Sequence, residues 1–249
     1  MSEIAAFEHG GYRYIKAVFQ YSGGIAAEPG FEIERARFMK PMALADGMAA
    51  AKAYLSSLGR PVSAIAAFEL RSPAPFTEPQ FKEFNETYVG NLEKWGIYKN
   101  GINPVARTNV CPEYSRPKVP MVYAFSYTLP TEGSRETFII SGGGEAKEGN
   151  KTYRESIVCL GDTSPAGMRS KIKYVMTEME SRLSALGFNW EAAVSTQGYT
   201  IHDIGKFIRP EIVERGAASG GFVWHFARPP IVDLEFEMDV RGTVREIVL

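Results

Sequence analysis

Hydrophobic and polar positions along the chain change between strand-like and helix-like spacing in a regular order. Aromatic and β-branched residues from Tyr12 to Tyr21 predict a strand that runs into a Ser-Gly-Gly turn. Apolar residues then recur at helical spacing in residues 41–59, and Gly59 is expected to end that helix. The pattern continues with a predicted strand at 63–72, a helix at 77–96, and strands around Val105–Cys111 and Met121–Leu129.

The same order of elements returns in the second half of the chain. A β-rich run at 137–149 again contains Ser-Gly-Gly, which predicts a tight turn because the Lys-Ser/Thr of a phosphate-binding loop is absent. A long helix is predicted within 164–190, and a shorter one within 204–216, where Pro210 implies a late start or a kink. Strands are predicted around 193–203, 221–227 and 232–241.

Matching motifs in the two halves indicate a duplication. The Ser-Gly pairs at Ser22 and Ser141, and the Leu-Gly pairs at Leu58 and Leu186, are about 120 to 130 residues apart, which is the length of a small domain. Turn-forming residues fill the segment 128–136 between the two passes. We therefore predict two tandem lobes, residues 1–130 and 131–249.

Composition narrows the classes of function. The chain carries 28 basic and 29 acidic residues, and this balance argues against general nucleic-acid binding. No apolar run reaches the roughly 18 residues of a membrane span, and the first residues lack the apolar core of a secretion signal. Cys111 and Cys159 lie far apart, so we expect two reduced thiols and a cytoplasmic location. The three histidines are widely spaced, and we predict neither a metal site nor a cofactor.

Several short motifs occur in an order that carries a family resemblance. The second lobe has Ser141-Gly142, Leu186-Gly187, YTIHD and a closing LEFEMDVR. In the first lobe the motif positions are Ser22-Gly23, Phe84, Asn85, Tyr88, Pro104, Ala106, Arg107 and Val110, with Val105 inserted. This order resembles the RidA/YjgF family, formerly also called the L-PSP endoribonucleases, whose members have SGQ, an F-x-x-x-N-x-x-Y-like helix and P-A-R-x-x-V.

The resemblance implies a fold, an assembly and a chemistry. Each lobe would be α+β and chorismate-mutase-like, a mixed β-sheet with two helices on one face, and the chain would form a homotrimer with clefts between lobes or subunits. The family chemistry is hydrolysis of enamines or imines to a keto acid and ammonia. An arginine holds the substrate carboxylate with its planar fork, while backbone groups by the Ser-Gly turn and an acidic residue on the last strand place water. A small-molecule carboxylate is therefore the expected ligand.

Arg107 matches the family arginine, but its acidic partner is missing from the first lobe. The closing strand at 121–129 has no carboxylate, whereas Glu235 and Glu237 lie on the corresponding strand of the second lobe, whose arginine position falls near Phe222. Either Arg107 meets Glu237 across a lobe or subunit boundary, or the chemistry is lost and an anion site is kept. Glu113 is a further candidate for the missing carboxylate.

Other residues are candidates for ligand binding. Asn109 shares a strand face with Arg107, and the segment WHFARPP places Trp224 and Arg228 close together. Around the first Ser-Gly pair the candidates are Tyr21, Ser22 and Gly23. We predict a hydrolase or deaminase for an enamine, imine or unsaturated carboxylic acid, with Arg107 as anchor and Glu237 or Glu113 positioning water. The alternatives are a non-catalytic carboxylate-binding protein of this fold and a chorismatase-like hydrolase, since chorismatases also resemble duplicated lobes.

Overall fold

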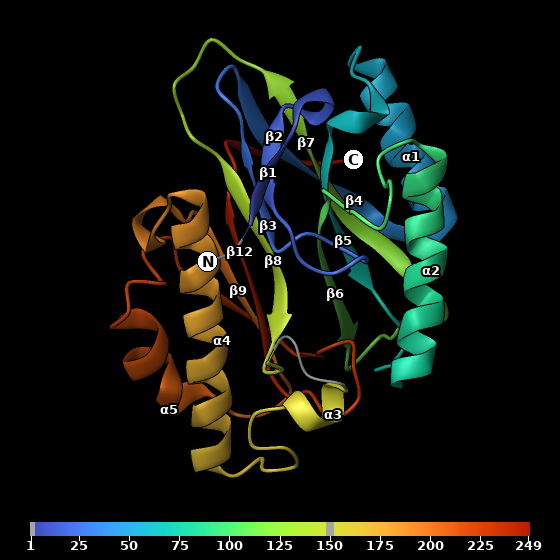
Figure 1. Ribbon diagram of the computed structural model, residues 1–249. Helices are drawn as coiled ribbons and strands as arrows, with labels where there is room; N and C mark the ends of the chain where they lie inside the picture. Colours follow the sequence, from blue (N-terminus) through green and yellow to red (C-terminus); the bar gives the residue numbers. More distant parts are fainter. Residues whose placement is uncertain (1–2, 148–151) are drawn as a thin grey trace.

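Two mixed β-sheets lie against each other in the computed structural model, with helices on both outer sides (Figure 1). The structure describes residues 3–147 and 152–249, so the end of the predicted run at 137–149 lies outside the described residues. Helices α1 (Leu44–Ser57) and α2 (Glu78–Lys94) cover one sheet, and α4 (Pro165–Leu186) covers the other. The predicted α+β class with two mixed sheets is confirmed.

The first sheet has the strand order β11-β6-β5-β7-β4-β13, and the second has the order β1-β2-β3-β8-β12-β9-β10. In the first sheet the strands are β4 (Phe31–Ala43), β5 (Ile65–Arg71), β6 (Ala106–Pro112), β7 (Met121–Pro130), β11 (Ala227–Arg228) and β13 (Arg245–Val248). In the second they are β1 (Ile4–Phe7), β2 (Tyr12–Ile15), β3 (Gly24–Ala27), β8 (Phe138–Gly144), β9 (Ser195–Tyr199), β10 (Phe222–His225) and β12 (Glu237–Gly242).

Each half of the chain contributes strands to the other half's sheet. Strands β1 to β3, from the start of the chain, join the second sheet through antiparallel pairing of β3 with β8. Strands β11 and β13, from the end of the chain, close the two edges of the first sheet by pairing with β6 and β4. The two lobes are therefore linked by backbone hydrogen bonds as well as by side chains.

Equivalent elements in the two lobes keep a constant spacing. The 3₁₀ turns η2 (Val62–Ala64) and η3 (Trp190–Ala192) lie 128 residues apart, as do Leu58 and Leu186 at the ends of α1 and α4. The last residues of β5 and β9, Arg71 and Tyr199, have the same spacing. This register allows positions in the two lobes to be compared one by one.

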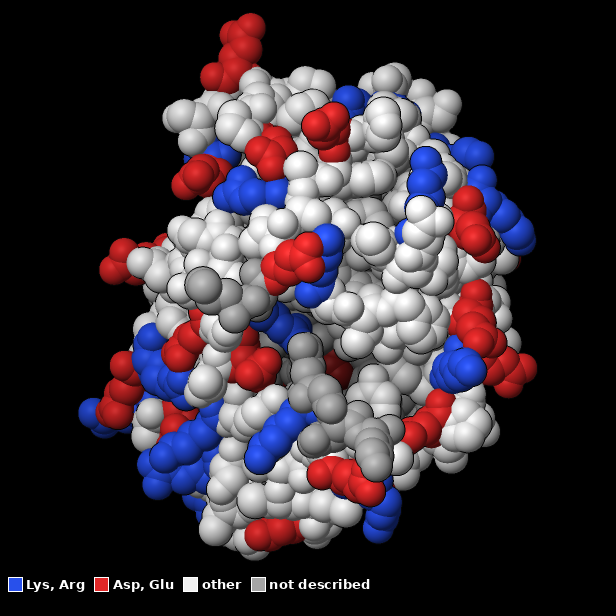
Figure 2. All heavy atoms as spheres, viewed as in Figure 1, with Lys and Arg blue, Asp and Glu red and all other residues white. Residues whose placement is uncertain are grey.

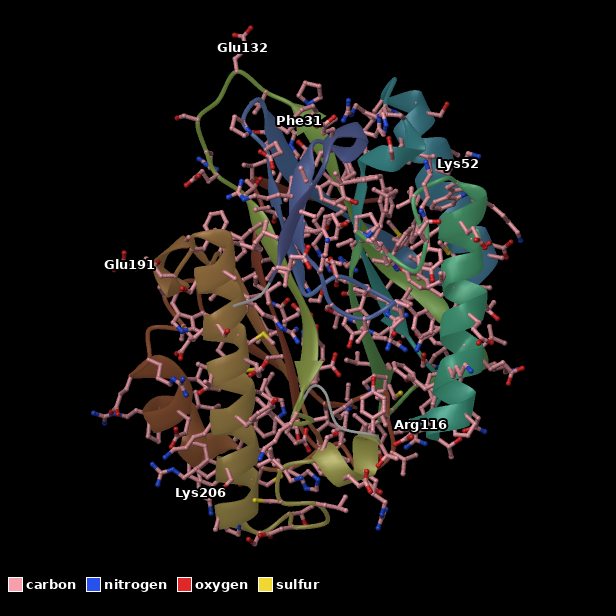
Figure 3. All side chains as sticks on the ribbon, viewed as in Figure 1. Phe31, Lys52, Arg116, Glu132, Glu191 and Lys206 are labelled. Atoms are coloured by element: carbon pink, nitrogen blue, oxygen red, sulfur yellow. The ribbon has the colours of Figure 1, made fainter. Side chains whose placement is uncertain are left out.

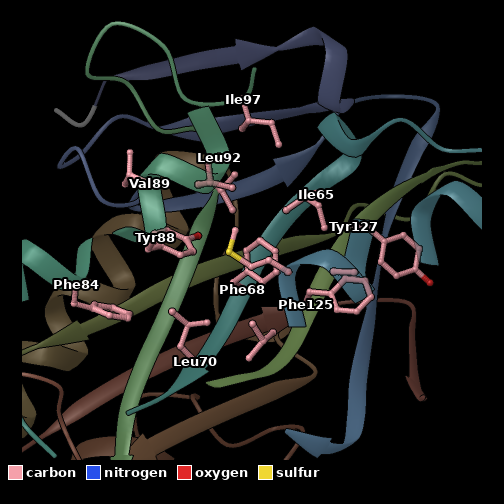
Figure 4. Packing of buried hydrophobic residues seen from close by; sticks show 14 of the residues in the cluster. Ile65, Phe68, Leu70, Phe84, Tyr88, Val89, Leu92, Ile97, Phe125 and Tyr127 are labelled. Carbon is pink, nitrogen blue, oxygen red and sulfur yellow. The ribbon is translucent and has the colours of Figure 1, made fainter. Parts of the chain in front are cut away.

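The helices pack as their apolar spacing predicts. Helix α2 directs Phe84, Tyr88 and Leu92 toward the strand residues Phe68 and Phe125, and all five are buried (Figure 4). Its start is fixed by a capping box between Thr77 and Gln80. Helix α4 ends where Gly187 adopts a left-handed conformation, as predicted. At the periphery, Lys52, Glu132, Glu191 and Lys206 point away from the molecule (Figure 3).

Three elements differ from the prediction. Strand β4 was not predicted, because its apolar positions shift from odd residues at Phe31 and Ile33 to even residues at Ala36 and Phe38. The predicted first strand at 12–21 is only β2 and an isolated bridge. The second helix of the second lobe is a three-residue α5 (Gly205–Phe207) followed by a π-helical segment (Ile208–Val213), because Pro210 cannot donate a backbone hydrogen bond.

The tight turn predicted at the Ser-Gly-Gly-Gly run in the second half is also wrong. Residues 141–144 form the last part of β8 and do not make a tight turn. Gly143 and Gly144 pair with Met238 and Glu237 of β12, and the backbone N–H of Ser141 donates to Gly23 O. The glycines leave the side of this strand open, and this opening is part of the cavity described next.

Candidate active site

A cavity of about 340 Å³ lies between the two lobes and is lined by both halves of the chain. Figure 2 shows the corresponding face of the molecule hollowed near its centre, with acidic atoms visible at depth. The first half contributes Tyr21, Arg107 and Asn109, and the second contributes Gly142, Arg182 and Glu237. Its size suits a small-molecule ligand, since such sites measure roughly 300 to 1,000 Å³.

Arg107 is a buried cation without a carboxylate partner in the described part of the chain. It lies on β6 with 3% of its surface exposed, and its Nη1 donates a hydrogen bond to Asn85 Oδ1 at 2.7 Å. The guanidinium lies 4.9 Å from the ring centres of both Tyr21 and Tyr88, so aromatic faces take the place of an acid. Burial lowers its pKa, but an arginine stays protonated in proteins. Its remaining N–H groups are suited to an external anion.

Glu237 lies at the start of β12 in the same cavity, and its carboxyl group is buried. Burial raises its pKa well above the usual value, and the negative charge of Asp239 raises it further, while Arg107 opposes both effects. The protonated, neutral form is therefore favoured. A Cβ atom on Gly142 would lie 2.3 Å from Glu237 Oε1, so the carboxyl group occupies the space that the glycine leaves.

Asn109 supplies a buried donor to the cavity. Its Oδ1 accepts a hydrogen bond from Ser72 Oγ at 2.9 Å, which directs the other end of the amide away from Ser72. Asn109 Nδ2 is buried and has no partner among the described residues. An unpaired buried donor costs about 1 to 3 kcal/mol, so the site favours a ligand or water that accepts from it.

The two Ser-Gly segments meet beside Arg107. Ser141 Oγ donates to the carbonyl of Ser22 at 2.6 Å and accepts from the backbone N–H of Arg107 at 3.1 Å. The backbone N–H of Ser141 donates to Gly23 O at 3.2 Å, and that of Ser22 donates to Val105 O at 2.9 Å. Ser22 and Gly23 thus hold β6 and β8 in place without lining the cavity, whereas Tyr21 lines it.

Four other predicted residues lie outside the cavity. Strand β11 pairs with the end of β6, and this brings Arg228 Nε within 2.7 Å of Glu113 Oε2. Trp224 Nε1 donates to the carbonyl of Thr200, and Glu235 pairs with His202 at 2.7 Å. These partners lie far apart in the sequence and close together in space, so the sequence alone could not identify the pairs.

Arg182 also lines the cavity, although no motif in the sequence marks it as a site residue. It lies on α4 between the buried residues Met179 and Leu183, and its Nη1 donates to the carbonyl of Ser141 at 3.3 Å. Its position next to the apolar stripe of a predicted helix is the one feature of the sequence that could have indicated this role. Tyr153, on the short helix α3 (Tyr153–Ser156), was missed as well, because no periodic pattern marks that segment.

The described ranges, 3–147 and 152–249, hold no group of three His, Cys, Asp or Glu side chains arranged to bind a metal ion. Within the same ranges, none of the helices has the length and apolar character needed to span a membrane.

A family profile and one curated protein match this chain over nearly its whole length. A family profile described as 2-aminomuconate deaminase CnbZ matches residues 4–247. The 2-amino-5-chloromuconate deaminase of Comamonas testosteroni is 55% identical over 251 residues, which is 100% of both chains.

Solved structures with similarity include a chorismatase and the YjgF gene product of E. coli. The chorismatase is 12% identical with a TM-score of 0.48, covering 91% of this chain and 78% of that one. The YjgF product is 17% identical with a TM-score of 0.32, covering 44% of this chain and 81% of that one.

Proposed function

The chain belongs to the 2-aminomuconate deaminase CnbZ family, and we propose that it hydrolyses 2-aminomuconate or a closely related enamine acid, releasing ammonia. The observation that carries this proposal is that Arg107 and Glu237 line the same cavity. Arg107 is a buried cation with no acid beside it in the described chain, and Glu237 is a buried carboxyl group held toward its neutral form.

Arg107 and Asn109 are proposed to hold the carboxylate next to the amino group. The guanidinium offers a planar pair of donors, and Asn109 Nδ2 adds a third donor from the same strand face. Desolvation strengthens both interactions because water no longer screens them. The substrate would thus be fixed with its enamine carbon beside Glu237.

Glu237 is proposed to transfer the protons. Its neutral form donates a proton to a carbon of the conjugated enamine, which converts the C–N bond to an iminium. The carboxylate that remains accepts a proton from water while the water oxygen bonds to the iminium carbon. Glu237, protonated again, gives its proton to the nitrogen of the carbinolamine; the C–N bond then breaks to release ammonia, and the hydroxyl group returns its proton to Glu237 as the keto group forms. In total, one enamine and one water give one 2-oxo acid and one ammonia.

Ammonia release from 2-aminomuconate generated in situ tests this function. We expect Arg107→Ala and Glu237→Gln each to reduce kcat/KM at least about hundredfold, because each removes a charge or proton used at the reacting centre. Glu113→Gln is the matched control, since Glu113 pairs with Arg228 outside the cavity. Its activity should stay within about threefold of the wild type.

Two results would contradict the proposal. Ammonia release at the buffer rate, with muconate still raising the wild-type melting temperature, would leave a binding protein in place of an enzyme. Loss of activity in Glu113→Gln with full activity in Glu237→Gln would move the acid-base role to the Glu113 pair.

A further inference from the structure

We propose that Glu145 and Lys171 are positioning residues for the deamination, a buried ion pair that fixes the first residues of β12 and so places the Glu237 carboxyl group in the cavity; this rests on the proposed deaminase function. Both side chains have 0% of their surface exposed, and neither residue lines the cavity. Lysine and glutamate are almost never buried completely unless they are paired. The contacts of this pair show what it holds in place.

The Glu145 carboxyl group binds three N–H donors. Lys171 Nζ lies 3.1 Å from Oε1. The backbone N–H of Glu235 donates to Oε1 at 2.6 Å, and that of Phe236 donates to Oε2 at 3.1 Å. Glu237 is the next residue and begins β12. These charge-assisted hydrogen bonds therefore fix the chain immediately before the proposed acid.

Lys171 extends the same anchor to the wall of the cavity. Its Nζ donates to the carbonyl of Val158 at 2.9 Å, and the backbone N–H of Val158 donates to the carbonyl of Glu145 at 2.8 Å. Tyr153 and Ser156, which come shortly before Val158 in the chain, line the cavity. One ammonium group of α4 thus holds both a cavity wall and the carboxyl group that fixes the start of β12.

The charge of Glu145 also acts on the proton of Glu237. Because all three partners of the Glu145 carboxyl group are donors, the ionised form satisfies every one of these hydrogen bonds. Burial raises the pKa of Glu145, whereas Lys171 and the backbone N–H groups oppose that rise. The negative charge of Glu145 in turn raises the pKa of Glu237, in addition to the larger effects of burial and Asp239. The pair therefore favours the neutral acid that proton donation requires.

Other groups act on Glu237 from the surrounding elements. They are Asp239 on β12, Arg107 and Cys111 on β6, Arg182 on α4 and Tyr153 on α3, and the cavity wall adds Glu78, Lys147 and Glu178. The two arginines lower the pKa of Glu237. Burial raises the pKa of the thiol and of the phenol, so both stay neutral. A substitution at Glu145 leaves all of these groups in the chain, and a shift in the titration of Glu237 can then be assigned to Glu145.

The charge of Glu145 can be tested separately from its reach. Glu145→Gln removes the charge and keeps the length of the side chain, whereas Glu145→Asp keeps the charge and shortens the side chain. We expect Glu145→Gln to move the alkaline limb of the kcat/KM profile for ammonia release to lower pH, because Glu237 then loses its proton more easily. Glu145→Asp should leave that limb in place and lower kcat about tenfold to hundredfold with a smaller change in KM, because Glu237 is displaced.

An infrared titration measures the proton of Glu237 without turnover. The band of a protonated carboxyl group that is present in the wild type and missing in Glu237→Gln reports on this proton. In Glu145→Gln the band should disappear at a lower pH than in the wild type. This measurement does not depend on ammonia release, so the inference and the deaminase function can each fail without the other.

Glu214→Gln is the matched control, because Glu214 is the exposed partner of Arg209 at 3.2 Å. It should change neither the pH profile nor kcat. An unmoved limb and an unmoved infrared band in Glu145→Gln would overturn the inference, and so would an unchanged kcat in Glu145→Asp. Glu145→Asp keeps an acid beside Lys171, so it still tests the positioning if the buried lysine prevents Glu145→Gln from folding.

Discussion

The two lobes share one order of elements but contribute different residues to the cavity between them. Phe68 pairs with Arg107 in the first lobe, and Thr196, 128 residues later, pairs with Phe222. At the other position, Arg71 pairs with Met121, whereas Tyr199, again 128 residues later, pairs with Glu237. The first lobe thus has the cation and an apolar residue, and the second has the acid and an apolar residue. A duplicated chain can divide a site in this way when its lobes meet at the cavity.

The second helix of each lobe also differs: it is regular in the first lobe and irregular in the second. In the first lobe, α2 spans Glu78–Lys94 and supplies Asn85 and Tyr88 directly beside Arg107. In the second lobe, the short α5 and the π-helical segment take the place of α2 in the order of elements. The strand that follows has Phe222 at the position equivalent to Arg107. The lobe with the buried cation thus has a regular helix that contacts the guanidinium, and the lobe with Phe222 at that position has an irregular one.

Replacing Glu237 by methionine, the residue at the equivalent position 121 of the first lobe, should have the largest effect on activity. Glu237→Met installs the residue that the first lobe has at the equivalent position, and it removes the proposed proton donor. We expect kcat/KM for ammonia release to fall about 10²- to 10⁴-fold, the usual contribution of a general acid or base. Met121→Leu is the matched control in the other lobe and should retain activity within about threefold. Equal losses in both variants would mean that the lobes are not functionally divided.

Filling the space at Gly142 should have a smaller effect. Gly142→Ala places a Cβ 2.3 Å from the present position of Glu237 Oε1, so the carboxyl group must move. We expect a roughly tenfold to hundredfold loss of kcat with a smaller change in KM, because misplacing a catalytic group by about 1 Å costs on the order of 10²-fold. Gly90→Ala on α2 is the control, since nothing lies within 4 Å of its Cβ position and alanine favours a helix. Unchanged kcat in Gly142→Ala would show that Glu237 is not placed by this contact.

The pH dependence of stability should show the smallest of these effects, and it compares Glu237 with Glu113. The pKa of Glu237 is raised by burial, so its contribution is complete below the ordinary glutamate value of about 4.3 and is lost as the pH rises through its folded pKa. Glu237→Gln should therefore become more stable relative to wild type as the pH rises. The pKa of Glu113 is lowered by its hydrogen bond to Arg228, so its contribution is present above that ordinary value and is lost as the pH falls through the folded pKa.

Melting temperatures between about pH 4 and 9 check these opposite signs. Glu113→Gln should lose stability relative to wild type at the upper end of the range, by a small amount because the pair is partly exposed. Parallel curves for wild type and Glu237→Gln would show that folding does not raise the pKa of Glu237.

Much of the fold was predictable from local pattern. Apolar spacing identified α1, α2 and α4, and Gly187 marked a helix end because a left-handed residue is needed there. Strand β4 was not identified, because ion pairs such as Arg35 with Glu69 let charged residues be buried and break the alternation. Local spacing cannot show which charges will be paired by distant residues.

Three features can be read from the order of residues alone: the duplicated order of elements, an arginine with no nearby acid in the first half, and an acid on the closing strand of the second. The folded arrangement is needed to see that Arg107 and Glu237 share one cavity, that Glu113 pairs with Arg228, and that Gly142 makes room for a carboxyl group. The physical reason is that spacing along the chain records which side of an element a residue occupies. The distance between elements depends on strand pairing across the lobes, which joins residues more than a hundred positions apart.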